Sequence, residues 1–170
     1  MKTKKCTNCG IEKPISAFYK HRYSKDGHAW QCKECNAKRG EIYRQTAKGV
    51  LVNLRSVNKC KHRREVNLDE EWFVNWYNTQ PRVCVYCSIP EEHVLLLPEH
   101  NIMRRPRLAI DCKDNDLGYV AGNIVLACGR CNFLKSNVFT YDEFKDIGAR
   151  YVKPKWMKLV KDKKGEEVKE

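Results

Sequence analysis

The fold of this chain is decided by one stretch, residues 110–135, which reads IDCKDNDLGYVAGNIVLACGRCNFLK. Two short apolar runs, 108–110 at its edge and 124–126 in its middle, predict two buried strands. The polar segment between them contains two glycines and predicts a turn. A Cys-x2-Cys pair follows the second run, and a helix is expected to begin near Asn132. This order predicts a small hairpin packed against a helix.

Ten cysteines are the second informative feature. Eight of them form four Cys-x2-Cys pairs, whereas Cys60 and Cys112 stand singly. Repeated close pairs are typical of zinc sites, because a tight turn aims two thiolates at one tetrahedral ion. The chain is therefore expected to hold two structural Zn²⁺ ions. Their predicted ligands are Cys6, Cys9, Cys32 and Cys35 in the first group and Cys84, Cys87, Cys128 and Cys131 in the second.

Length and composition favour small modules over one large core. The chain has 170 residues, of which 42% are hydrophobic and 32% charged. Small modules need a bound metal ion or a cross-link to stay folded, and metal ions bound by the cysteine groups would provide this stabilisation. We expect an α+β fold of two zinc-stapled modules joined by helices. The expected segments are 1–40, a four-cysteine module; 41–80, a basic helix, a linker and an amphipathic helix; 81–150, the second module; and 151–170, a charged, flexible tail.

The positive charge is concentrated in one part of the chain. Residues 1–65 contain 17 lysines and arginines against 5 acidic residues, and the remainder contains 16 of each. Such an excess favours a polyanionic partner, and nucleic acid is the commonest. A basic surface that serves solubility alone is the alternative. The first candidates for phosphate contact, on a helix expected over 36–59, are Lys38, Arg39, Arg44, Lys48 and Arg55.

Turn residues, glycines and a helix cap predict the positions of several further helices and turns. Asp26-Gly27 predicts a turn between two strands, and Gly40 and Gly49 weaken or break the basic helix. Asn67 is the expected N-cap of a helix that ends near Asn78. One face of that helix is expected to be core and carries Trp72, Phe73, Trp76 and Tyr77. The expected core of the first module consists of Ile15, Phe18, Tyr19, Tyr23 and Trp30.

A polar pair flanks the predicted hairpin. Asp111 ends the first strand, and Asn132 opens the following helix. If the hairpin folds back on the helix, a carboxylate and a carboxamide face each other across a cleft. Such oxygen ligands suit Mg²⁺ or Mn²⁺ better than zinc. The alternative is a turn carboxylate and a capping amide that never meet.

Residues 82–137 resemble the HNH endonucleases, the ββα-metal nucleases, and in particular the branch with a four-cysteine zinc site common in phage and mobile elements. The matching motifs are Cys84-Val-Tyr-Cys87, Ile110-Asp111, Gly118-Tyr119, Gly122-Asn123 and Cys128-Gly-Arg-Cys131-Asn132-x2-Lys135. The resemblance implies a ββα-metal fold for the second module and hydrolysis of DNA phosphodiesters, with a homing endonuclease among the expected kinds. The first module is similar to the small four-cysteine finger often fused ahead of phage HNH domains.

The resemblance implies a role for each matching residue. Asp111 and Asn132 hold one catalytic Mg²⁺ or Mn²⁺ ion, and Asn123 ties down the loop between the two strands. Arg130 and Lys135 contact phosphate. A solvated surface charge is the alternative for both basic residues.

One position departs from the family pattern. The residue after the aspartate is usually a histidine that takes a proton from the attacking water. Here it is Cys112, and a thiol can act as a base only if its pKa is lowered. His93 and His100 lie in the same module and are other candidates for the base. Loss of the proton by bulk water without a base, and an inactive site, are the remaining alternatives.

The leading hypothesis is therefore an endonuclease that acts on double-stranded DNA and cuts one strand or both. A catalytically degenerate HNH-fold protein, serving as a zinc-dependent DNA-binding or regulatory factor, is the alternative. An RNA- or ribosome-associated zinc protein is a third. No secretory signal or membrane span is visible, so we expect an intracellular protein, in the host cytoplasm if phage-encoded, without a membrane or protein partner.

Overall fold

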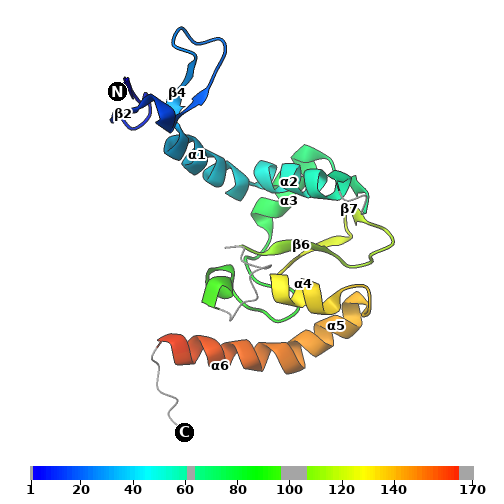
Figure 1. Ribbon diagram of the computed structural model, residues 1–170. Helices are drawn as coiled ribbons and strands as arrows, with labels where there is room; N and C mark the ends of the chain where they lie inside the picture. The colour runs from blue at the N-terminus through cyan, green and yellow to red at the C-terminus, as the bar shows by residue number, and fades with distance from the viewer. Residues whose placement is uncertain (1, 61–63, 97–106, 165–170) are drawn as a thin grey trace. The chain divides into compact units, whose positions relative to one another are not determined.

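The computed structural model describes residues 2–60, 64–96 and 107–164 of the chain. It divides into two compact units, residues 1–53 and 54–170. Both units combine helices with two-stranded sheets, and each contains one group of four cysteines (Figure 1). The predicted α+β fold of two cysteine-stapled modules is confirmed.

The first unit is built from two short hairpins and a helix. Strands β1 (Thr3–Lys5) and β2 (Glu12–Pro14) pair antiparallel, as do β3 (Phe18–Lys20) and β4 (His28–Cys32). The turn η1 (Ile15–Ala17) joins the hairpins, and helix α1 (Lys33–Gln45) follows them. Gly27 lies between β3 and β4 with a φ of +73°, which suits glycine. The turn predicted at Asp26-Gly27 is confirmed.

The core of this unit is smaller than the sequence predicted. Phe18 is buried among Cys6, Cys32 and Cys35, with Ala17 packed against them. In contrast, Tyr19, Tyr23 and Trp30 are 49%, 74% and 54% exposed. Their assignment to the core was wrong, because three cysteines and one phenylalanine already fill so small an interior.

The basic helix is broken at Thr46 and not at Gly40. Helix α1 ends there, and α2 (Ala47–Cys60) begins with the next residue. The Thr46 hydroxyl donates to the Tyr43 carbonyl and accepts from the Gly49 amide, so one side chain serves both helix ends. Gly49 permits the bend, because a Cβ there would lie 2.0 Å from the Tyr43 carbonyl oxygen.

In the second unit, helix α3 (Glu70–Thr79) begins two residues later than expected. Its N-cap is Asp69, whose carboxylate accepts from the Trp72 amide, and not Asn67. Phe73 and Tyr77 are buried, as expected for a core face, whereas Trp72 and Trp76 are only half-buried. Asn67 belongs instead to strand β5 (Val66–Asn67), which pairs in parallel with β7 (Tyr119–Val120).

The predicted hairpin and helix are present, although the helix begins at Gly129 with Cys128 as its N-cap, so that Asn132 lies inside it and does not open it as expected. Strand β6 (Ala109–Cys112) pairs antiparallel with β8 (Ile124–Ala127), and Asp111 lies opposite Val125. Helix α4 (Gly129–Lys135) follows β8 and packs against β6. The turn η2 (Glu91–Leu96) precedes the hairpin in the chain. The ββα arrangement expected of the second module is confirmed.

The chain then forms three consecutive helical elements, drawn from orange to red in Figure 1. They are α5 (Tyr141–Ile147), the π-helical turn η4 (Gly148–Val152) and α6 (Lys153–Lys164). The capping box of Thr140 and Glu143 at the start of α5 is present. Helix α6 occupies a segment in which we expected a flexible tail. The wider turn η4 ends two residues before Pro154, whose nitrogen carries no hydrogen to donate to the preceding turn of a regular helix.

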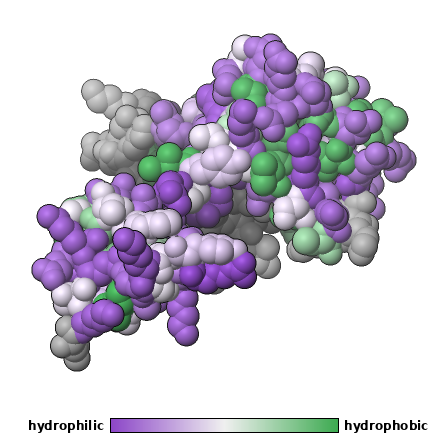
Figure 2. Space-filling model, turned by 90° about the horizontal axis from the view of Figure 1, so that it is seen from above, coloured by the Kyte–Doolittle hydropathy of each residue, from purple (hydrophilic) through white to green (hydrophobic). Residues whose placement is uncertain are grey.

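Much of the surface in view in Figure 2 is hydrophilic, with hydrophobic residues in separate small areas. This agrees with a chain in which 32% of the residues are charged. Within the described residues, no helix is both long and apolar enough to cross a bilayer.

Candidate active site and metal centres

The first cysteine group fits a tetrahedral metal ion. The sulfur atoms of Cys6, Cys9, Cys32 and Cys35 all lie within 4.8 Å of one another, and those of Cys6 and Cys35 are 3.9 Å apart. Zinc–sulfur bonds of about 2.3 Å in a tetrahedron require about 3.8 Å between sulfurs. Backbone N–H groups of Cys9 and Cys32 lower the pKa of Cys6 to about 6, which favours the thiolate that zinc needs. This group could hold a structural zinc ion.

The second cysteine group is fully buried. It consists of Cys84, Cys87, Cys128 and Cys131, and the sulfurs of Cys87 and Cys128 are 3.9 Å apart. The Cys128 sulfur also caps α4, because it accepts from the Cys131 amide at 3.4 Å. Hydrogen bonds from the neighbouring thiols lower the pKa of Cys84. This group too could hold a structural zinc ion, and Cys60 and Cys112 belong to neither group.

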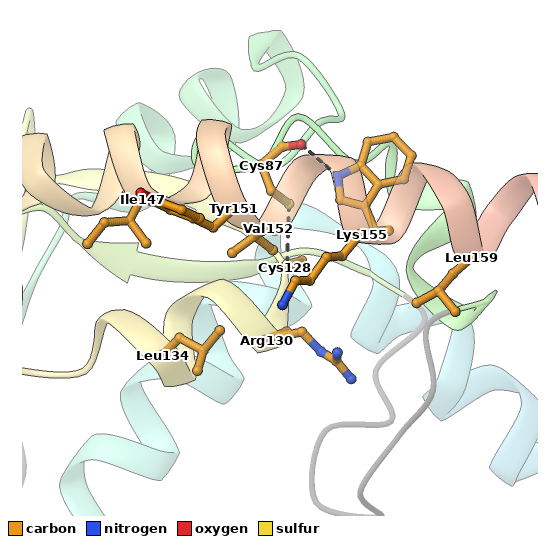
Figure 3. A pocket seen from close by; sticks show the side chains of 10 residues that line it. Cys87, Cys128, Arg130, Leu134, Ile147, Tyr151, Val152, Lys155 and Leu159 are labelled. Carbon is orange, nitrogen blue, oxygen red and sulfur yellow. Dashed lines mark hydrogen bonds between the residues drawn. The ribbon is translucent and has the colours of Figure 1, made fainter.

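Helix α6 is fastened to the second cysteine group. The indole N–H of Trp156 donates to the Cys87 carbonyl at 2.7 Å. Beside this contact lies a cavity of about 340 Å³, and Figure 3 shows its lining, with side chains of α4 on one side and of η4 and α6 on the other. Gly148 brings the helical segment close, since a Cβ there would lie 2.7 Å from the Tyr86 carbonyl oxygen. These contacts hold η4 and α6 against the segment of the second Cys-x2-Cys pair.

Asp111 is the buried carboxylate of the ββα arrangement, with 4% of its surface exposed. The Tyr86 hydroxyl donates to its Oδ2 atom at 2.7 Å, and the Lys135 ammonium lies 3.7 Å from the same oxygen. Burial raises the pKa of Asp111, while Tyr86 and Lys135 oppose that rise. Burial also raises the pKa of Tyr86, which keeps its hydroxyl protonated as a donor. The carboxylate is therefore held in one orientation.

Lys135 does not lie on the surface, where we expected it to contact phosphate. Its side chain is 1% exposed, and its ammonium donates to the Cys112 carbonyl at 2.9 Å. The position in the last turn of α4 directs it toward β6, against which the helix packs. The expected phosphate contact is corrected to an internal ion pair with Asp111.

Asn123 closes the loop between the strands. Its amide donates to the carbonyls of Asp114 and Gly118, both at 2.7 Å, and its side-chain oxygen accepts from the Asp114 amide at 3.0 Å. Gly118 has a φ of +67°, and a Cβ there would lie 2.9 Å from the Glu65 carbonyl oxygen. The loop-fastening role implied for Asn123 agrees with these bonds.

Cys112 has the environment of a buried thiol. It is 0% exposed, and burial raises its pKa to about 12. A thiol that stays protonated near neutral pH cannot accept a proton from water. His93 lies in η2 beside Glu92, with no hydrogen bond or ion pair to Asp111 among the described residues. His100 lies outside the described residues.

Asn132 lies on α4, the helix that packs against the strand carrying Asp111. It is half-buried, and among the described residues its side chain makes no hydrogen bond. A carboxylate and an uncommitted carboxamide on neighbouring elements fit the oxygen chemistry of Mg²⁺ or Mn²⁺. By residue type the two side chains could serve as ligands of a divalent ion.

The candidate phosphate contacts on α1 and α2 are exposed; they are Lys38, Arg39, Arg44, Lys48 and Arg55. Arg39 donates to the Asn36 side chain, and Arg55 donates to the Leu68 carbonyl, so both are held by local bonds. Arg130 is half-buried and lines the cavity beside the cysteines.

Sequence reasoning missed Tyr86 as a site residue. It lies inside the second Cys-x2-Cys pair, between Cys84 and Cys87, and is 1% exposed. A metal-binding pair fixes the backbone on both sides of such a residue, which gives its side chain a defined direction. The position of Tyr86 between two predicted metal ligands was therefore the feature of the sequence that could have identified it.

The chain is similar to a solved structure of the rare-cutting HNH restriction endonuclease PacI, with a TM-score of 0.57 and 24% sequence identity. The match covers 91% of this chain and 96% of that chain. At this identity the likeness shows the fold, with its ββα-metal module, and not the activity. No protein-family model matches the chain, and no curated protein matches it.

Proposed function

We propose that this protein is an HNH-type endonuclease that hydrolyses phosphodiester bonds of double-stranded DNA. The observation that carries the proposal is the buried Asp111 carboxylate on β6, next to the helix that bears Asn132. The fold shared with a restriction endonuclease supports the same assignment. A phage or mobile-element origin and a homing role rest on the sequence resemblance alone.

The proposed catalytic metal ligands are Asp111 and Asn132. When bound there, Mg²⁺ or Mn²⁺ would supply charge stabilisation to the scissile phosphate and the leaving oxygen. Tyr86 and Lys135 orient the Asp111 carboxylate, and Asn123 keeps the adjacent loop closed. The zinc-binding group of the same unit anchors α4 through the Cys128 cap.

We further propose that different parts of the chain bind the DNA and cleave it. Residues 81–150 form the cleaving module, and the basic residues of 1–80 hold the duplex through its phosphates. Exposed lysines and arginines on α1 and α2 support this second part. Affinity for DNA should therefore fall steeply with rising salt, because bound phosphates release their counterions.

One observation favours the second candidate function, a DNA-binding or regulatory factor without cleavage. Cys112 stands where the family has its base, and the structure buries it as a protonated thiol. An active enzyme must therefore use another proton acceptor, such as solvent.

A plasmid cleavage assay tests the proposal. Zinc-loaded protein with added Mg²⁺ or Mn²⁺ is compared with Asp111→Ala and Asn132→Ala, each checked for bound zinc and DNA affinity. We expect the wild type to nick or linearise the plasmid and both variants to bind DNA without cutting it. A wild type that binds a broad set of DNA sequences but cuts none with any divalent ion would establish the second candidate function instead.

A further inference from the structure

Three neighbouring aromatic side chains, two of them exposed and one half-buried, lie on the β3–β4 hairpin of the first unit. The half-buried His21 ring contacts both of the others, at 4.9 Å from the Trp30 ring and 6.1 Å from the Tyr23 ring, measured between centroids. Trp30 is 54% exposed and Tyr23 is 74% exposed. We call these three residues the hairpin aromatic surface. Large aromatic side chains gathered on a surface mark an interaction site more often than isolated ones do.

Tyr23 and Trp30 are not part of the buried cluster of their unit. The interior is filled by Phe18 and the cysteines, so burial does not explain why the hairpin carries tyrosine and tryptophan. The Nδ1 atom of His21 is buried without a hydrogen-bond partner among the described residues. Packing against the neighbouring rings, and not a polar contact at Nδ1, thus holds the His21 ring in place.

The hairpin aromatic surface is fixed by the first cysteine group. The Trp30 carbonyl accepts from both the amide and the hydroxyl of Thr7, which lies between Cys6 and Cys9. At the turn, Asp26 pairs with Lys4 at 2.6 Å and accepts from the His28 amide. A surface held in this way loses little conformational freedom when it binds a ligand.

Its surroundings are cationic. The Arg22 guanidinium lies 4.4 Å from the centre of the Tyr23 ring, and Lys20 and Lys25 are exposed on the same hairpin. Residues 1–53 contain 12 lysines and arginines against 4 acidic residues. Aromatic faces interleaved with cations match the alternating bases and phosphates of a nucleic acid strand.

We propose that the hairpin aromatic surface stacks against an unpaired base of DNA. Bases inside a duplex are covered on both faces by their neighbours, so only a base outside the stack can offer its face to Trp30. The phosphates on either side would then lie near Arg22 and the hairpin lysines. This inference rests on the proposed action on DNA and assigns to the first unit a base contact beyond phosphate binding.

The test compares two labelled duplexes of equal length, one fully paired and one with a single unpaired adenine. Fluorescence anisotropy gives the affinity of the full-length, zinc-loaded protein for each. We expect Trp30→Leu to weaken binding of the duplex with the unpaired adenine by about 10-fold, within the range for losing one base–aromatic stack. The dependence of affinity on salt should not change, because no phosphate contact is removed. Trp30→Phe should restore most of the lost affinity.

Tyr43→Leu is the matched control, since Tyr43 is an aromatic residue of the same unit, 48% exposed, and lies on α1. It should bind both duplexes like the wild type. Equal affinity of wild type and Trp30→Leu for the unpaired adenine would overturn the inference, while plasmid cleavage would still support the proposed function. A changed sedimentation coefficient of DNA-free Trp30→Leu, with unchanged DNA affinity, would overturn it in favour of contact between copies. Failure of the wild type to bind either duplex or plasmid would refute both proposals together.

Discussion

A buried ammonium beside a buried carboxylate governs the energetics of the candidate site. Lys135 and Asp111 are 1% and 4% exposed, and removal of one member of such a pair leaves the other charge uncompensated. We expect Lys135→Met to lower the free energy of unfolding by about 3 kcal/mol, measured by urea denaturation. Added Mg²⁺ or Mn²⁺ should recover part of this loss if Asp111 binds the ion.

Lys158→Met provides the control for this substitution. Lys158 is exposed on α6, so its replacement should change the free energy of unfolding by less than about 0.5 kcal/mol. A stable Lys135→Met protein with a shallower salt dependence of DNA binding would show that Lys135 contacts phosphate after all.

Cys112 allows a second test at the level of one side chain. Its pKa of about 12 leaves the thiol protonated throughout the range in which DNA is stable. We therefore expect Cys112→Ala to cleave plasmid with the same pH dependence as the wild type between about pH 6 and pH 9. The small cavity should cost about 1 kcal/mol of stability. Loss of cleavage in a folded, zinc-loaded Cys112→Ala protein would identify the thiol as a participant.

Among the secondary-structure elements, the close contact between η4 and the second Cys-x2-Cys pair can be tested by substitution. A Cβ on Gly148 would meet the Tyr86 carbonyl oxygen at 2.7 Å, and backbone cannot move aside cheaply. We expect Gly148→Ala to destabilise the second unit by about 1–3 kcal/mol in urea denaturation, although alanine favours helix. Gly40→Ala is the matched control, because its Cβ would meet only the flexible Arg44 side chain at 3.3 Å. A stabilised Gly148→Ala protein would mean that the segments can separate at no cost.

The elements that could be predicted from the sequence are those marked by nearby residues, such as apolar runs, turn glycines and helix caps. The hairpin of β6 and β8 follows from two apolar runs with a glycine-containing loop between them, and the start of α5 follows from Thr140 and Glu143. The parallel pairing of β5 with β7 could not, because two-residue strands separated by more than fifty residues leave no periodic pattern. The break at Thr46 depended on a bond between two helix ends, which residue types alone do not reveal.

In the candidate site, too, some features could be predicted from the sequence and others could not. The cysteine groups and the polar residues at the hairpin were visible as residue types at a recognisable spacing. The burial of Lys135 and the bond from Tyr86 depend on which way a side chain points after packing, and both residues lie on segments where either direction is compatible with the sequence. Tertiary contact, and not local preference, decides such orientations.

For the whole molecule, the two units differ in what holds them together. Around its cysteines the first unit buries one phenylalanine, and its other buried apolar side chains, Ala47, Val50 and Leu51, lie on α2, so we expect the fold of its hairpins to depend on a bound metal ion. The second unit also buries large apolar side chains away from its cysteines, among them Phe73, Leu108 and Phe144. Loss of zinc should therefore affect the units unequally.

Single cysteine substitutions in the full chain test this difference. We expect Cys6→Ser to reduce bound zinc from two ions to one and to make residues 1–53 sensitive to protease, while the second unit stays folded. The lysines and arginines of the unfolded unit remain attached, so the salt dependence of DNA binding should persist although the affinity falls. Plasmid cleavage should survive at low salt, because the proposed metal ligands belong to the second unit.

In contrast, Cys84→Ser should abolish cleavage, since it disrupts the cysteine group that anchors α4. Loss of both zinc ions and of all near-ultraviolet circular dichroism in Cys6→Ser would instead show that the two units fold as one cooperative structure.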